Sequence, residues 1–80
     1  MKVQIRIRVY GHLNRYLPER QRQIMVELEA PIAVDEVLNR IGLPAQEVWI
    51  RRLNRTEQVY GDRVLQDGDQ LELFPLVAGG

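Results

Sequence analysis

Apolar and polar side chains alternate along residues 2–9, as they do in a β-strand that buries one face. The predicted inward face carries only aliphatic side chains: Val3, Ile5, Ile7 and Val9. Residues 23–29 repeat this period with Ile24, Val26 and Leu28. The first third of the chain therefore predicts two half-buried strands. Between them, Leu13, Tyr16 and Leu17 favour a short helix over residues 12–17 that ends at Pro18.

A helical period replaces the alternation in residues 34–41. Four apolar residues fall at i, i+3, i+4 and i+7, the stripe of an amphipathic helix: Val34, Val37, Leu38 and Ile41. Asp35 and Glu36 in the first turn suit the helix dipole, and Gly42 followed by Pro44 favours an end after residue 41. We expect this stripe to pack across the apolar faces of the two strands.

A third strand over residues 48–53 is predicted without a clear register. If Trp49 and Leu53 share the buried face, Arg51 lies inward; in the other register Arg52 does. A β-bulge, or an arginine stem lying along the sheet rim, would resolve the conflict, and both registers stay open. Residues 58–60 favour a brief fourth strand.

The last alternating segment is residues 70–74, which follows the turn formed by Asp67, Gly68 and Asp69. Leu71 and Leu73 form its predicted buried face, whereas Phe74 lies on the other face with Gln70 and Glu72. Pro75 ends the strand because proline has no N–H for a ladder. The order of elements predicts one α+β domain in these 80 residues.

A short apolar tail, residues 76–80, ends in two glycines. Without a Cβ, Gly79 and Gly80 would fit a channel too narrow for any side chain, and the carboxylate of Gly80 would be open to attack. Five extended residues reach roughly 16–18 Å, enough to enter the active site of a partner. The plainer interpretation is a frayed terminus, since chain ends are commonly disordered.

Composition excludes several classes of function. Eleven basic and eleven acidic residues cancel, so nothing draws the protein generally to nucleic acid or to a membrane. The absence of cysteine excludes disulfides, thiolate chemistry and iron–sulfur sites. No apolar run is long enough for a membrane span or a signal peptide, so we expect a cytoplasmic protein. Lys2 is the only lysine, so the protein has almost no internal lysine to which further copies could be joined to form a chain of linked proteins.

The inventory of reactive side chains is small. His12 has no serine, cysteine or carboxylate at a telling distance in sequence, and we interpret it as a surface residue. Asp62, Asp67 and Asp69 lack the spacing of a calcium loop and are better explained as turn residues. Nucleophile elbows and phosphate-binding loops are absent from the sequence. We therefore expect no enzyme, no metal and no stably bound cofactor.

The end of the chain resembles the MoaD/ThiS family of ubiquitin-like sulfur carriers. The resemblance rests on Leu65-Gln66-Asp67-Gly68-Asp69, Leu71, Leu73-Phe74-Pro75 and Val77-Ala78-Gly79-Gly80, together with the upstream pair Leu53-Asn54. It implies a β-grasp fold, with a mixed sheet of four to five strands and one main helix on one face. The first and last strands would be parallel neighbours, residues 1–75 would form the domain, and residues 76–80 would form a flexible tail.

The resemblance also implies a function. An ATP-dependent, ubiquitin-activating-type adenylyltransferase (MoeB/ThiF-like) would adenylate Gly80, and sulfur would then replace AMP to leave a thiocarboxylate. Gly79 and Gly80 would be the working residues, and ATP would be used by the activating enzyme alone. The length and the helical insert favour molybdopterin biosynthesis, with the molybdopterin synthase large subunit as acceptor. Carriers for thiazole, cysteine or tRNA thiolation remain alternatives.

Partner enzymes would bind the sheet face next to the tail. The predicted docking residues are an exposed aromatic, the apolar segment that follows it and two arginines of the first strand: Phe74, Pro75, Leu76, Val77, Ala78, Arg6 and Arg8. Exposed aromatic residues with flanking arginine are typical of an interface core. An alternative of another class is a ubiquitin-like interaction module whose C-terminus is never activated.

Overall fold

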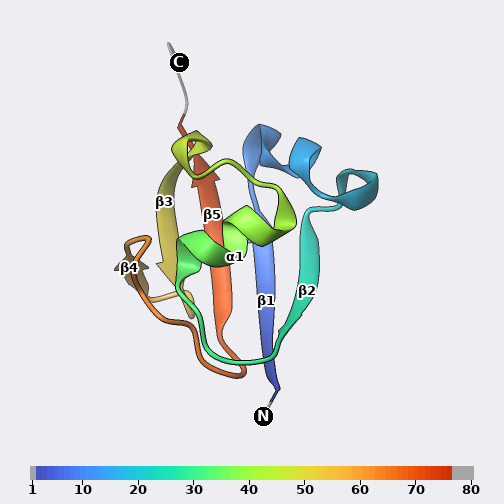
Figure 1. The fold of residues 1–80 in the computed structure, drawn as a ribbon. Coiled ribbons are helices and arrows are strands. Elements are labelled where there is room, and N and C mark those ends of the chain that lie inside the picture. The colour runs from blue at the N-terminus through green and yellow to red at the C-terminus, as the bar shows by residue number, and fades with distance from the viewer. Residues whose placement is uncertain (1, 77–80) are drawn as a thin grey trace.

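The first and last alternating segments lie side by side at the centre of one sheet (Figure 1). The structure is a computed structural model, and it describes residues 2–76. Strand β1 (Val3–Val9) runs parallel to β5 (Gln70–Pro75), with Arg6 opposite Gln70 and Val9 opposite Leu73. The predicted parallel pairing of the first and last strands is confirmed.

Three further strands complete a mixed five-stranded sheet in the order β2-β1-β5-β3-β4. Strand β2 (Gln23–Leu28) is antiparallel to β1 and forms one edge. Strand β3 (Val48–Leu53) is antiparallel to β5, and the short strand β4 (Glu57–Val59) forms the other edge. The predicted β-grasp fold is confirmed.

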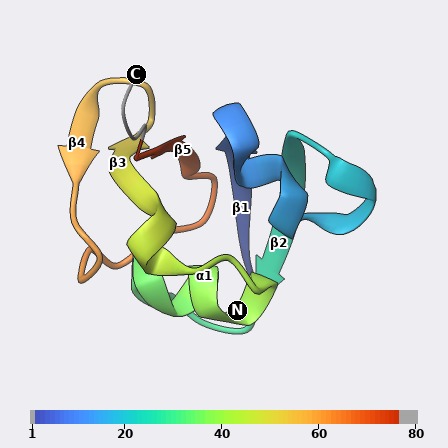
Figure 2. The same cartoon turned by 90° about the horizontal axis from the view of Figure 1, so that it is seen from above.

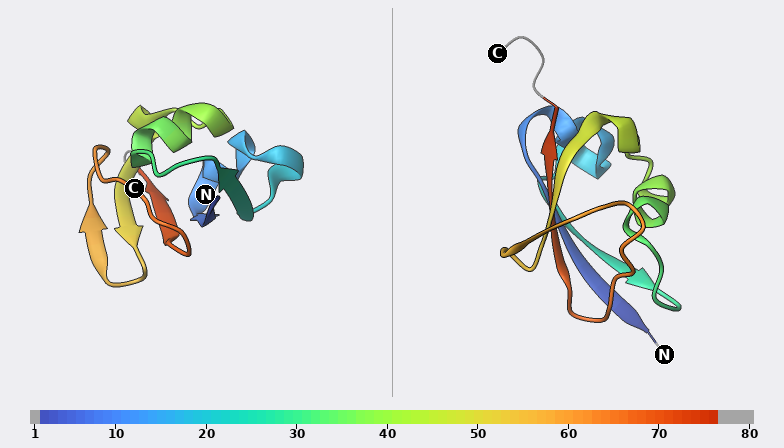
Figure 3. Two further views of the ribbon diagram at one scale, coloured as in Figure 1. Left: turned by 60° about the horizontal axis from the view of Figure 1, so that its bottom comes forward. Right: turned by 90° about the vertical axis from the view of Figure 1, so that its left-hand side faces the viewer.

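One helix, α1 (Val34–Ile41), covers one face of the sheet (Figures 2 and 3). It ends where predicted, because Gly42 adopts a left-handed conformation (φ 83°) and its N–H bonds the carbonyls of Leu38 and Asn39. Three short 3₁₀ helices line the connections: η1 (Gly11–Tyr16), η2 (Pro18–Arg20) and η3 (Ala45–Glu47). Within residues 2–76, none of the helices has the length and apolar character needed to cross a bilayer.

The core lies between α1 and the central strands. Ile5, Val37, Leu38 and Leu71 are fully buried, as their periodicity predicts. The inward residues of β2 are less well covered, since Ile24 and Val26 are only half-buried. The helix therefore packs mainly over the centre of the sheet, where β1 and β5 meet.

A β-bulge in β3 resolves the conflict between the two arginines. The ladder with β5 shifts between Val48 and Ile50, so that Arg51 lies opposite Leu73 and Arg52 opposite Glu72. Arg51 therefore lies on the helix side, where its Nε donates a hydrogen bond to the Asp35 carboxylate of α1 at 2.9 Å. A charge on the buried side of the sheet is tolerated because it is paired.

Candidate functional site

A buried carboxylate occupies the sheet face opposite α1. The alternation in β5 predicts that Glu72 points to solvent, yet Glu72 is only 1% exposed. Its two neighbours on adjacent strands are Arg8 of β1 and Arg52 of β3. Long side chains from these strands and from Tyr10 cover the carboxylate, so this face is not a plain solvated surface.

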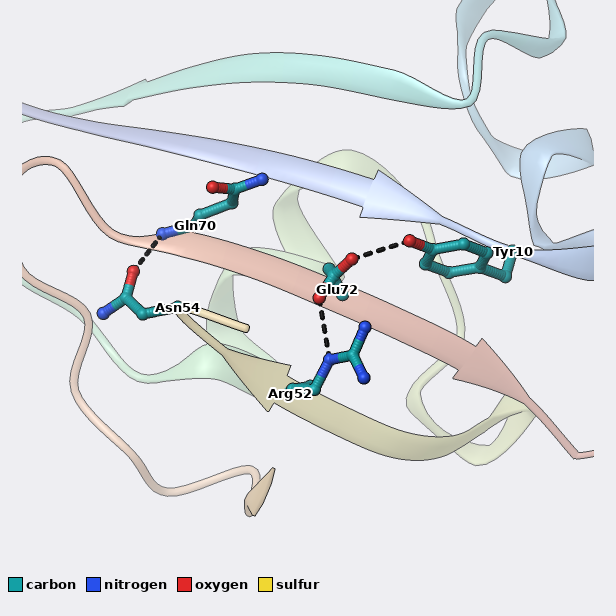
Figure 4. A network of polar contacts seen from close by, with 5 residues as sticks. All are labelled: Tyr10, Arg52, Asn54, Gln70 and Glu72. Carbon is teal, nitrogen blue, oxygen red and sulfur yellow. Dashed lines mark hydrogen bonds and ion pairs between the residues drawn. The ribbon is translucent and has the colours of Figure 1, made fainter. Parts of the chain in front are cut away.

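Two hydrogen bonds satisfy the Glu72 carboxylate (Figure 4). The Tyr10 hydroxyl donates to Oε2 at 2.6 Å, and Arg52 Nε donates to Oε1 at 2.8 Å. These donors come from both sides of β5, because Tyr10 follows β1 and Arg52 belongs to β3. The three side chains tie the central strands together across the open face.

The electrostatics of this group favour a charged pair and a neutral phenol. The hydrogen bond from Arg52 is the largest influence on the pKa of Glu72 and lowers it. Burial raises this pKa, whereas the hydrogen bond from Tyr10 lowers it further. The same bond to Glu72 raises the pKa of Arg52. The pKa of Tyr10 is raised, first by its hydrogen bond to Glu72 and then by burial. Glu72 is therefore ionised at neutral pH while Tyr10 keeps its proton.

Tyr10, which binds the carboxylate, also belongs to an aromatic pair. The rings of Tyr10 and Phe74 stack with centroids 4.5 Å apart and planes 3° from parallel. Arg8 Cζ lies 5.4 Å from the centre of the Tyr10 ring, and Arg52 Cζ lies 5.0 Å from that of Phe74, both within cation–π range. We call these five residues (Arg8, Tyr10, Arg52, Glu72 and Phe74) the open-face cluster.

The structure corrects two expectations about the docking residues. Phe74 was expected to be an exposed aromatic, but it is half-buried because it stacks on Tyr10. Pro75 was expected to continue the apolar strip of Phe74, but it is buried, like Leu71 and Leu73, and its ring lies against Gly11. Leu76 is exposed, at 56%.

The two predicted arginines of β1 lie in different surroundings. Arg8 belongs to the open-face cluster. Arg6 pairs with Gln70 at the other end of β5, beside a shallow groove of about 290 Å³ that includes the turn at Asp67. Neither arginine forms an ion pair with another residue of the 2–76 range. The remaining predicted site residues, Val77, Ala78, Gly79 and Gly80, lie outside the described residues.

Sequence reasoning missed three members of the cluster: Tyr10, Arg52 and Glu72. No sequence pattern assigned a role to Tyr10, which lies one residue beyond the first predicted strand. One signal for the position of Glu72 was available in the sequence. The predicted pairing of the first and last strands places Glu72 next to the arginines of the first strand. The burial of Glu72, however, depends on side chains from three strands at once.

Other polar side chains considered in the sequence have partners within the fold. Asp69 accepts a hydrogen bond from the Gln66 N–H within its own turn, and Asp67 accepts one from the Gln4 N–H of β1. His12 Nε2 lies 3.2 Å from the Glu47 carboxylate, which the sequence had not connected with it. Among residues 2–76, no three potential metal-ligand side chains come together.

The pKa of Glu72 predicts how stability should depend on pH. Its folded pKa lies below the ordinary value, so its ionised form stabilises the fold above that value and this stabilisation is lost as the pH falls through the folded pKa. Arg52→Met removes the largest cause of the lowered pKa. We expect the variant to be less stable than the wild type near pH 7, and the difference to shrink near pH 3.

Urea unfolding of both proteins at the two pH values measures this effect. Arg40→Met is the control, because it breaks only the exposed pair of Arg40 with Glu36 on α1. An equal loss of stability at both pH values for Arg52→Met would contradict the assigned role of Glu72.

Comparison with known proteins identifies the type of fold. The family model described as Mut7-C ubiquitin matches residues 2–79. No curated protein matches the sequence. The structure is similar to small archaeal modifier protein 1 of Haloferax volcanii, with 17% identity and a TM-score of 0.72 over 94% of this chain and 99% of that one.

Two further solved structures carry the name of a converting factor. One is a candidate molybdopterin converting factor subunit 1 from Pyrococcus furiosus, with 18% identity and a TM-score of 0.71 over 94% of this chain and 99% of that one. The other is a chain in the complex of subunits 1 and 2 of molybdopterin-converting factor from Helicobacter pylori. It has 18% identity and a TM-score of 0.58, over 98% of this chain and 100% of that one. Likeness at this level of identity shows a shared fold.

Proposed function

The chain belongs to the Mut7-C ubiquitin family, and on this premise we propose that it is a ubiquitin-like sulfur carrier whose working group is the carboxylate of Gly80. The predicted kinship with MoaD/ThiS-like ubiquitin-like proteins is confirmed at the level of this family and fold. The sulfur chemistry and its pathway are our proposal.

One observation carries the proposal: the sequence Leu76-Val77-Ala78-Gly79-Gly80 follows directly on the central strand of a β-grasp sheet. The last backbone hydrogen bond described along this segment is the one from the Leu76 N–H to the Glu47 carbonyl. The next four residues in the sequence, 77–80, have small or aliphatic side chains. Two glycines at the end suit a channel that excludes side chains.

The proposed chemistry takes place in two steps, for which Gly80 must carry the free carboxylate. In the first, a carboxylate oxygen attacks the α-phosphorus of ATP in an activating enzyme, and pyrophosphate leaves. In the second, hydrosulfide attacks the carbonyl carbon, and the C–O bond breaks as AMP leaves with the bridging oxygen. The product is a thiocarboxylate on Gly80. The protein is thus a co-substrate, and ATP is bound by its partner.

We further propose that the acceptor is the large subunit of a molybdopterin-synthase-type enzyme. This is supported by the names of two structural neighbours, one of which is solved as a complex of subunits 1 and 2. Delivery of sulfur to thiazole, cysteine or tRNA synthesis uses the same thiocarboxylate, so the experiment on loading is independent of the acceptor.

Intact-mass spectrometry tests the proposal. The protein is incubated with an activating enzyme of the adenylyltransferase class, ATP and hydrosulfide. We expect a mass gain equal to the replacement of one oxygen by sulfur, which fragmentation places on Gly80. No gain, or a gain elsewhere in the chain, would refute the sulfur-carrier proposal.

A second candidate function, a docking module without an activated end, is favoured by the open-face cluster. Tyr10, Phe74 and the arginines are organised by Glu72, and this organisation involves residues of the 2–76 range only. Binding of partners that persists unchanged after removal of residues 77–80, without any sulfur loading, would favour this alternative.

The cluster predicts separate effects for two substitutions. Phe74→Ala should weaken binding to the activating or acceptor enzyme by about 1–3 kcal/mol, as expected for an aromatic anchor. Because Phe74 stacks on Tyr10, the same change should also lower the melting temperature. Arg8→Ala should mainly slow association and reduce its salt dependence, because Arg8 is an exposed charge.

Titration calorimetry and thermal melts on both variants measure these effects. Arg6→Ala is the control for Arg8→Ala, since Arg6 is exposed on the same strand but lies away from the cluster. Unchanged affinity for Phe74→Ala, with a lowered melting temperature, would mean that the ring serves the fold alone.

A further inference from the structure

Two 3₁₀ helices hold the end of β5, where the tail begins in the sequence. The Leu76 N–H donates to the Glu47 carbonyl of η3 at 3.2 Å, one residue beyond the end of β5. Pro75 packs against Gly11 of η1, where an added Cβ would come within 2.7 Å of the proline ring. His12 and Glu47 join η1 to η3 across this point at 3.2 Å. Pro75 and Leu76 are therefore held in place at the end of β5.

A large apolar side chain is exposed beside this point. Trp49 is the residue inserted at the β3 bulge, between the pairs Val48–Pro75 and Ile50–Phe74. It is 62% exposed, although tryptophan is among the most buried residue types on average. β-Bulges commonly redirect a side chain next to a functional site. The bulge therefore places Trp49 at the end of the β3–β5 ladder, where the tail begins.

Leu76 and Trp49 are two of the five large hydrophobic residues exposed in the range 2–76. A single exposed apolar side chain needs no explanation. Trp49 and Leu76 both border the last rungs of the same ladder, and we treat the two exposed side chains as one apolar patch. Patches of this kind are typical of binding sites.

The length of the tail determines what covers this patch. Residues 77–80 span at most about 13–14 Å when extended. An enzyme that holds Gly80 in its active site must therefore bring its own surface within that distance of Leu76. Trp49 borders the same end of β5 and therefore lies within reach of that surface.

We infer that Trp49 and Leu76 form an apolar anchor that binds a hydrophobic pocket at the entrance of the adenylating enzyme's active site. This inference rests on the proposed function. The adenylating enzyme is the occupant because loading of Gly80 requires that encounter whichever acceptor follows. Burial of a tryptophan in such a pocket is a common source of binding energy in protein interfaces.

Steady-state kinetics of pyrophosphate release test the anchor. We expect Trp49→Ala to raise the KM for the carrier by roughly tenfold to a hundredfold, with kcat little changed, because the anchor acts in binding and not on the reacting atoms. Trp49→Phe should recover most of the affinity. Tyr60→Ala is the control, since Tyr60 is 69% exposed but follows β4 at the sheet edge.

Trp49 also supplies a direct probe, because it is the only tryptophan in the chain. Fluorine NMR of fluorotryptophan-labelled carrier should show a shifted resonance when the unlabelled enzyme is added. Wild-type turnover with an unchanged KM for Trp49→Ala would overturn the anchor alone. If the wild-type protein supports no pyrophosphate release, the proposed function fails and the anchor fails with it.

Discussion

Deletion of Gly80 should abolish sulfur loading and leave the folded body unchanged. The deletion moves the terminal carboxylate to Gly79, one residue or about 3.3–3.6 Å short of its position in the activating enzyme. Adenylation requires the reacting oxygen to be placed within a fraction of that distance, and misplacement by about 1 Å already costs about a hundredfold in rate. We therefore expect no detectable mass gain in the truncated protein.

Intact-mass spectrometry after incubation with the activating enzyme, ATP and hydrosulfide measures the loading. Gly80→Ala is the matched control for length: it keeps the carboxylate in register but adds a methyl group that a narrow channel excludes. We expect slow loading for this variant and full loading for Arg40→Met, whose substitution lies on α1. Equal loading of the truncated and wild-type proteins would show that Gly80 is not the acceptor.

Leu71→Ala should destabilise the protein by about 2–5 kcal/mol. Leu71 is fully buried on the central strand, opposite Ile7 of β1 and Leu53 of β3. Its side chain lies where the neighbouring strands and α1 leave little room for the structure to collapse into the cavity. Domains of this size have total stabilities of about 5–8 kcal/mol, so the variant should be close to unfolding.

Urea unfolding followed by circular dichroism gives the free energy of unfolding. Met25→Ala is the control, because Met25 is 54% exposed on the edge strand β2 and should change stability little. A loss below about 1 kcal/mol for Leu71→Ala would mean that β5 lies in another register, with Leu71 outside the core.

Most of the fold was predictable because local patterns agreed with the final structure. The alternation of Val3, Ile5, Ile7 and Val9 matches their burial on β1. The stripe on residues 34–41 became α1, and Gly42 ended it. The residues on the buried side of a helix or strand recur with the period of that element. Burial can therefore be predicted from the sequence wherever the other side of the element faces solvent.

The site was predictable only in part. The sequence indicated the Gly79–Gly80 ending and the outward position of Phe74 and Arg8, and the roles of these residues stay predictions. It did not indicate that Pro75 packs against Gly11 or that Tyr10 stacks on Phe74, because those contacts join the segment after β1 to β5 across more than sixty positions of the chain.

The sequence by itself determined which residues enter the core, because hydrophobic periodicity is a property of neighbours along the chain. Only the tertiary structure decided three features of the sheet: the inward position of Arg51, the exposure of Trp49 and the burial of Glu72. The first two follow from a one-residue bulge that changes the side on which each side chain of β3 lies. The third follows from strand order, because a carboxylate in an alternating strand is buried only when adjacent strands bring a guanidinium and a phenol over it.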